Sequence, residues 1–145
     1  TALSTGTGKS EPVKPGTMDM VLTFRNLHNW MLDGELEASL RAFHKALKPG
    51  GVLGIVDHRG RTDQTQAQQI TSGYVREDEA IAAIEKAGFV LQARSEVNAN
   101  PRDTKDHPEG VWTLPPTYRL KDKDRSIYAA IGESDRFTLK FIKPR

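Results

Sequence analysis

The residues best suited to chemistry lie in one short stretch, "TFRNLHNW", Thr23 to Trp30. It follows an apolar run and contains one histidine, His28, between two amides, Asn26 and Asn29. A histidine can act as a general base near neutral pH, amides can hydrogen-bond a ligand, and the Trp30 ring can form an aromatic wall. The alternative is a polar loop whose Asn and His side chains cap the next helix and satisfy backbone groups. The local pattern leaves both interpretations open.

A second candidate pair, Asp57 and His58, lies in "VDHRG" at the end of another apolar run. An aspartate at this place can orient a histidine or bind a substrate hydroxyl. The alternative, which the pair alone favours, is that these residues cap a helix or form a turn.

A third polar stretch, "NPRDTKDHPEG", covers residues 100–110 and contains Asp103, Asp106 and His107. Its prolines are typical of a lid over a crevice or of a surface loop, and both interpretations stay open. The histidines and carboxylates of the chain do not have the spacing of a metal-binding motif, so we expect no metal site.

The glycines and lysine of "STGTGKSEP", residues 4–12, resemble a phosphate-binding loop at first sight. The Walker pattern requires a glycine five positions before Gly8, and that position is Leu3. No apolar strand precedes the stretch, and prolines follow it. We therefore expect residues 1–17 to be a flexible lead or loop.

The elements that must position these residues can be read from periodicity. Leu36, Leu40, Phe43 and Leu47 mark one face of a helix over 33–48, and further helices are expected over 76–87 and 122–131. The expected strands are 18–24, 52–57, 89–97 and 136–143, with a long irregular loop at 98–118. The apolar run "MDMVLTF" predicts that the first strand is buried, and the alternating last strand has one wetter face.

Strands that alternate with helices predict an α/β sheet. Ligands of such sheets bind at the carboxyl ends of the strands, which here nominates residues 24–30 and 57–59.

Composition excludes several partners. The 145 residues include 21 basic and 19 acidic side chains, for a net charge of +2, so there is no electrostatic case for nucleic acid. No apolar run approaches the roughly 18–20 residues that span a membrane, and the absence of cysteine excludes a thiolate nucleophile.

Four segments together resemble the C-terminal half of a class I S-adenosylmethionine-dependent methyltransferase: "MDMVLTFRNLHNW", "LEASLRAFHKALKPGGVLGIVDH", "AIAAIEKAGFVLQARSEV" and "DRFTLKFIK". The tail is similar to a group of bacterial predicted methyltransferases. The resemblance implies a Rossmann-like sheet in which the four strands are the fourth to seventh, with the last one antiparallel. It covers residues 18–145 as a partial methyltransferase domain.

The resemblance implies roles for particular residues. "NLHNW" is similar to the "LHxW" segment of small-molecule O-methyltransferases, in which the histidine, here His28, takes the proton from the acceptor hydroxyl. The segment after the fourth strand would line the methionine end of S-adenosylmethionine, and the remaining candidates would face the substrate. The cofactor residues are then Phe24, Arg25, Asn26 and Leu27, and the substrate-pocket residues are Asn29, Trp30, Asp57 and His58.

The family's glycine-rich cofactor loop, D/E-x-G-x-G-x-G, does not occur in the 145 residues. Two hypotheses follow. The chain is part of a methyltransferase whose N-terminal half is supplied by a longer or separate chain, and it acts on a small-molecule acceptor such as a hydroxyl compound. Alternatively, it is a non-catalytic α/β domain that forms a homodimer through the exposed edge of its first strand.

Overall fold

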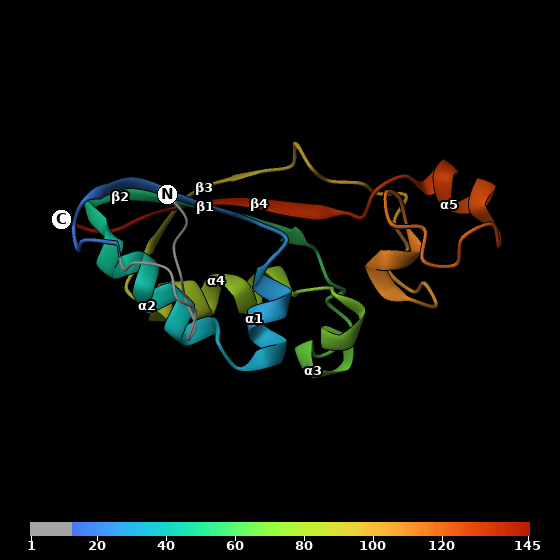
Figure 1. The fold of residues 1–145 in the computed structure, drawn as a ribbon, viewed down its shortest axis with the longest axis horizontal. Helices are drawn as coiled ribbons and strands as arrows, with labels where there is room; N and C mark the ends of the chain where they lie inside the picture. The colour runs from blue at the N-terminus through green and yellow to red at the C-terminus, as the bar shows by residue number, and fades with distance from the viewer. Residues whose placement is uncertain (1–12) are drawn as a thin grey trace.

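The computed structural model describes residues 13–145, and these form a mixed sheet with helices packed against it (Figure 1). The phosphate-loop-like stretch at residues 4–12 lies outside the described residues. The strands are β1 (Met18–Phe24), β2 (Leu47–His58), β3 (Val90–Ser95) and β4 (Arg136–Ile142). The helices are α1 (Leu27–Asp33), α2 (Leu36–Ala46), α3 (Gln66–Gln69), α4 (Glu77–Lys86) and α5 (Arg125–Ile131), with 3-10 turns η1 (Ile70–Ser72) and η2 (Gly110–Thr113).

The strand order is β1-β2-β4-β3, and β2 is parallel to β1 but antiparallel to β4. In register, Phe24 lies opposite Val56, and His58 lies opposite Arg136. The carboxyl ends of β1 and β2 therefore meet the amino end of β4 at one edge of the sheet. This edge is where α/β sheets bind ligands.

The helix expected over 33–48 is wrong in its bounds. Within this range the helix is α2, which begins at Leu36 and ends at Ala46, and a separate helix that was not expected, α1, precedes it and ends at Gly34, whose φ of 73° is left-handed. The apolar face of Leu36, Leu40 and Phe43 belongs to α2, whereas Leu47 already begins β2. Half of "TFRNLHNW" is thus helix α1 and not loop. Between β2 and α4 the chain also forms α3 and η1, neither of which was expected from the sequence.

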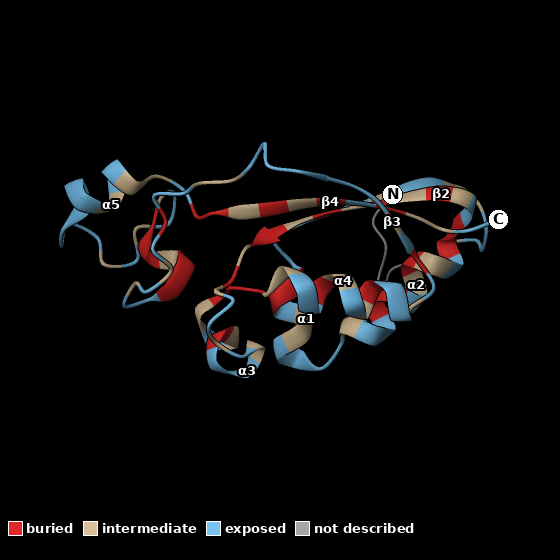
Figure 2. Cartoon of the chain, turned by 180° about the vertical axis from the view of Figure 1, so that it is seen from behind, coloured by how far each residue is buried: buried red, intermediate tan, exposed pale blue. Residues whose placement is uncertain are grey.

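The core lies between the sheet and helices α1, α2 and α4, all of which cover the same face (Figures 1 and 2). Side chains that alternate along β4 point into this core: Phe137, Leu139 and Phe141. No helix of the described residues lies on the opposite face of the sheet, as Figure 1 shows.

The expectation that β1 is a buried strand is wrong for its outer face. Met20, Leu22 and Phe24 are each more than half exposed, because they point away from the helices, while Val21 and Thr23 point toward them. Among residues 13–145, no helix combines the length and the apolar character that crossing a membrane would need.

Candidate functional site

A buried aspartate holds the histidine of the "LHNW" helix. Asp57 is fully buried at the carboxyl end of β2, and its carboxylate lies 2.9 and 3.1 Å from Nδ1 of His28. The same carboxylate accepts the backbone N–H groups of His28 at 2.8 Å and His58 at 2.7 Å. Because a carboxylate accepts hydrogen bonds, Nδ1 of His28 carries the proton, which leaves Nε2 as an acceptor.

A second histidine, His58, stands next to the first. The two imidazole centroids are 5.2 Å apart, and Nδ1 of His58 lies 2.5 Å from the Ser134 hydroxyl. The pKa of His58 is lowered to about 4, mainly by burial. The negative charge of Asp57 raises this pKa, whereas the nearby His28, Arg136 and Arg25 lower it. His58 is therefore a neutral hydrogen-bonding group at physiological pH.

A cavity of about 330 Å³ opens at this edge of the sheet. It is shaped by the end of β1, the start of α1, the end of β2, the start of β4 and the loop around η2. Its lining combines imidazole, guanidinium and amide groups with an indole and two prolines: Phe24, Arg25, Asn26, His28, Asn29, His58, Val111, Trp112, Pro115, Pro116, Thr117, Ser134 and Arg136.

The long loop at 98–118 forms one wall of the cavity. Its Trp112 ring packs edge-on against His28, with centroids 5.9 Å apart. The residues of this loop that line the cavity all follow residue 110, and none of the Pro-rich stretch 100–110, for which a lid and a surface loop were both left open, lies on the cavity wall.

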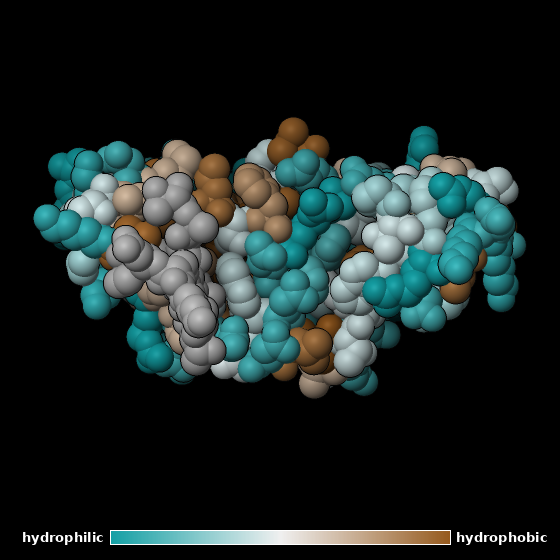
Figure 3. All heavy atoms as spheres, viewed as in Figure 1, coloured by the Kyte–Doolittle hydropathy of each residue, from teal (hydrophilic) through white to brown (hydrophobic). Residues whose placement is uncertain are grey.

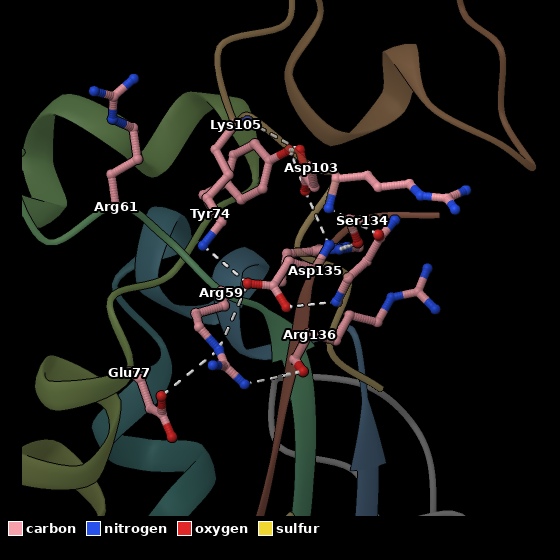
Figure 4. A network of polar contacts seen from close by, with 12 residues as sticks. Arg59, Arg61, Tyr74, Glu77, Asp103, Lys105, Ser134, Asp135 and Arg136 are labelled. Atoms are coloured by element: carbon pink, nitrogen blue, oxygen red, sulfur yellow. Dashed lines mark hydrogen bonds and ion pairs between the residues drawn. The ribbon is translucent and has the colours of Figure 1, made fainter. Parts of the chain in front are cut away.

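A buried network anchors this loop (Figure 4). Asp103 accepts hydrogen bonds from the Tyr74 hydroxyl at 2.9 Å and from the Asp135 backbone N–H at 2.9 Å, and it lies 2.8 Å from Nε2 of His107. Lys105 forms an ion pair of 2.9 Å with Asp135. Asp103 and His107, which the sequence offered as candidate chemistry, therefore hold the loop in place.

The structure brings together six of the nine predicted site residues on the cavity wall: Phe24, Arg25, Asn26, His28, Asn29 and His58. Asp57 lies directly behind His28. The other two do not reach the cavity wall. Leu27 and Trp30 lie on the inner side of α1. Leu27 is therefore buried in the core, and the Trp30 ring packs against Phe43 of α2 with centroids 5.5 Å apart.

Sequence reasoning missed the cavity residues that come from the second half of the chain. Trp112 stands in a loop without periodicity, so no pattern indicated that it turns back toward His28. Ser134 and Arg136 carried a usable signal: an antiparallel last strand begins at the edge where the parallel strands end, so its first residues belong to the site.

The side chains of His28, Asp57 and His58 also offer ligand atoms within 4.8 Å of one another, a spacing that could hold a metal ion. The Asp57 carboxylate already accepts three hydrogen bonds, from the backbone N–H and Nδ1 of His28 and from the backbone N–H of His58, which favours a role in orienting His28 over one as a metal ligand. Nδ1 of His28 is taken by Asp57, and Nδ1 of His58 by Ser134. The arrangement is that of an oriented base beside a neutral imidazole.

No family model matches the chain, and no curated protein matches it in sequence. Solved structures do match. The cyclase SpnF aligns with a TM-score of 0.62 at 16% identity over 93% of this chain and 53% of that one. A Methanosarcina mazei S-adenosylmethionine-dependent methyltransferase aligns with a TM-score of 0.58 at 10% identity, over 93% of this chain and 63% of that one. Haemonchus contortus phosphoethanolamine N-methyltransferase 2, in complex with S-adenosyl-L-methionine, aligns with a TM-score of 0.53 at 16% identity, over 92% of this chain and 35% of that one.

The chain has a fold shared with S-adenosylmethionine-dependent methyltransferases. At these identities the likeness concerns the fold alone. The chain spans between about a third and two thirds of the length of these three structures.

Proposed function

We propose that this chain is the acceptor-binding, C-terminal part of an S-adenosylmethionine-dependent methyltransferase that acts on a hydroxyl group of a small molecule. The observation that carries the proposal is the pair of His28 and Asp57. A buried carboxylate fixes the imidazole, and the imidazole lines a cavity at the ligand-binding edge of a sheet whose fold is shared with such enzymes.

In this mechanism His28 is the general base. Its Nδ1–H donates to Asp57, so the lone pair on Nε2 accepts the proton of the acceptor hydroxyl. When bound, S-adenosylmethionine supplies an electrophilic methyl group. The Asp57 carboxylate stabilises the imidazolium that forms, because the two groups are in contact inside a buried site.

The surrounding residues shape the acceptor site. The Trp112 indole and the prolines at 115 and 116 provide apolar walls that exclude water from the proton transfer. The neutral His58 imidazole, fixed by Ser134, provides a hydrogen-bonding group beside the base.

The residues at the end of β1 fit one end of the cofactor. The aromatic ring of Phe24 suits the sulfonium group through a cation–π contact. The Asn26 amide and the Arg25 guanidinium suit the carboxylate, by hydrogen bonding and by charge. We assign the methionine end of S-adenosylmethionine to them. The rest of the cofactor site would come from the glycine-loop half, on a longer or separate chain.

The strand order supports this assignment to the C-terminal part. If β1 to β4 are the family's fourth to seventh strands, the observed order β1-β2-β4-β3 corresponds to the family's order 4-5-7-6, in which the last strand is antiparallel. The incomplete coverage of the matching structures is consistent with it.

The test uses the complete enzyme and measures S-adenosylhomocysteine formed with a panel of hydroxyl compounds. His28→Ala should lower turnover by about 10²–10⁴-fold, the range for loss of a general base. Asp57→Asn should lower turnover less, and it should change the His28 tautomer seen in nitrogen-15 NMR spectra. His44→Ala, at a histidine outside the cavity, serves as the control. Turnover of His28→Ala close to that of the control would remove His28 as the base.

A further inference from the structure

The cavity wall carries positive charge without a matching carboxylate. Arg25 and Arg136 both line it, and no aspartate or glutamate does. Within residues 13–145 Arg25 forms no ion pair. A concave wall of one charge sign attracts a ligand of the opposite sign.

Arg136 is the less solvated of the two, and it is poorly paired. Its side chain is 14% exposed, and its one ion pair in the described chain joins Nη2 to Glu133 at 3.3 Å, where the glutamate side chain is 55% exposed. Its Nε is buried without a hydrogen-bond partner in the same part of the molecule. A guanidinium that is withdrawn from water in this way gains most from a ligand that accepts several hydrogen bonds.

Arg59 provides the contrast on the neighbouring strand end. Its Nη2 lies 2.6 Å from Glu96. Its Nε also lacks a hydrogen-bond partner within the described residues, but it lies 3.7 Å from a carboxylate oxygen of Glu77 and 3.8 Å from one of Asp135, so Arg59 is paired with three carboxylates where Arg136 is paired with one. Figure 4 shows the Arg59 side chain inside this network, whereas the Arg136 side chain extends away from it. Arg59 is thus committed to structure, and Arg136 remains available to a ligand.

The position of Arg136 fits the geometry of the acceptor site. It stands opposite His58 in the sheet register, two residues after Ser134, and therefore shares the cavity with His28. A cavity of about 330 Å³ suits a compound of about one ring.

We propose that Arg136 binds an anionic oxygen group, a carboxylate or a phosphate, on the same acceptor whose hydroxyl faces His28. The substrate class is then a small hydroxy acid or a hydroxylated phosphate ester. The acceptor role rests on the proposed function, whereas binding of the anion by Arg136 does not depend on methyl transfer.

The experiment is calorimetric titration of three matched probes into the 145-residue chain: 4-hydroxybenzoate, 4-hydroxyphenyl phosphate and the neutral 4-hydroxybenzamide. We expect at least one anionic probe to bind about tenfold more tightly than the amide, the effect of one charge-assisted contact. Whether 4-hydroxybenzoate or 4-hydroxyphenyl phosphate binds more tightly identifies the anionic group as a carboxylate or a phosphate. Arg136→Gln should abolish the preference for the anion over the amide, and Arg136→Lys should restore part of it.

Arg41→Gln removes the same charge from the exposed face of α2 and is the control. Equal affinity for all three probes, absence of binding by any of them, or a preference that survives in Arg136→Gln would overturn the proposal. A preference lost only in Arg136→Gln, combined with absence of methyl transfer in the complete enzyme, would overturn the proposed function and leave the anion site standing.

Discussion

His58 shows how one buried group in the candidate site links chemistry to stability. It is 7% exposed, and burial is the main reason that its pKa falls from 6.5 to about 4. The neutral ring is what allows it to hold Ser134 beside a neighbouring histidine and two arginines. The unfolded chain has no such constraint, so its histidine titrates near 6.5.

This difference predicts acid sensitivity. Between pH 6.5 and about 4 the unfolded state binds a proton at His58 that the folded state does not, so the free energy of unfolding falls as pH falls through this window. The loss reaches about 3 kcal/mol at its lower end. Above pH 6.5 both states are neutral at this position and the contribution is constant.

The measurement compares urea unfolding of the wild type and His58→Gln from pH 8 to about 4. Other titrating groups act in both proteins, so the difference between the two curves isolates His58. The wild type should lose more stability than the variant below pH 6.5. Parallel curves would contradict the lowered pKa.

At the scale of elements, the loop of residues 98–118 depends on a close approach between η1 and η2. Gly110 has a φ of 58°, and a Cβ there would lie 2.7 Å from the Cα of Ser72 and would also overlap its carbonyl oxygen. Glycine is required here both for its backbone conformation and for the missing side chain. This contact places Trp112 against His28.

Gly110→Ala should therefore destabilise the protein more than an ordinary left-handed glycine would. Gly34→Ala is the matched control, because Gly34 has a φ of 73° and nothing within 4 Å of its Cβ position. We expect a cost of about 1–2 kcal/mol for the control from conformation alone. Overlap with Ser72 should add about 1–3 kcal/mol for Gly110→Ala. Equal losses in denaturant unfolding would mean that the contact with η1 is not needed.

The elements also show what the sequence could and could not predict. Short apolar runs located β1 and β2, the alternating pattern located β4, and the 3.6-residue pattern located α2 and α4, because burial of one face dictates the spacing. Helix α1 was missed because its seven residues are too few for a periodic signal and its polar residues suit a loop equally well.

The same limit applies to the candidate site. Residues that follow the parallel strands, such as His28 and Asp57, were predictable from the edge rule. Trp112 and the network of Asp103 were not, because their positions depend on contacts between residues far apart in the chain.

At the scale of the whole molecule, the helices of residues 13–145 cover one face of the sheet and leave the other without a helix. Met20 and Leu22 on β1 are 53% and 55% exposed, and β1 is also an edge strand that pairs with β2 alone among the described strands. Hydrophobic residues are visible on the sheet side of the molecule in Figure 3. Parallel strands are normally covered on both faces, so a partner surface is expected.

We propose that the 145-residue chain alone forms a homodimer through β1 and the open face beside it. In sedimentation velocity at tens of micromolar, the wild type should behave as a dimer. The double variant Met20→Lys, Leu22→Lys should be a monomer, because it would bury two unpaired charges in the interface. The double variant Leu32→Lys, Ile127→Lys adds the same charge at apolar residues of equal exposure on α1 and α5, and it should stay dimeric. A monomeric wild type, or a β1 variant that remains a dimer, would show that this face does not bind a second copy.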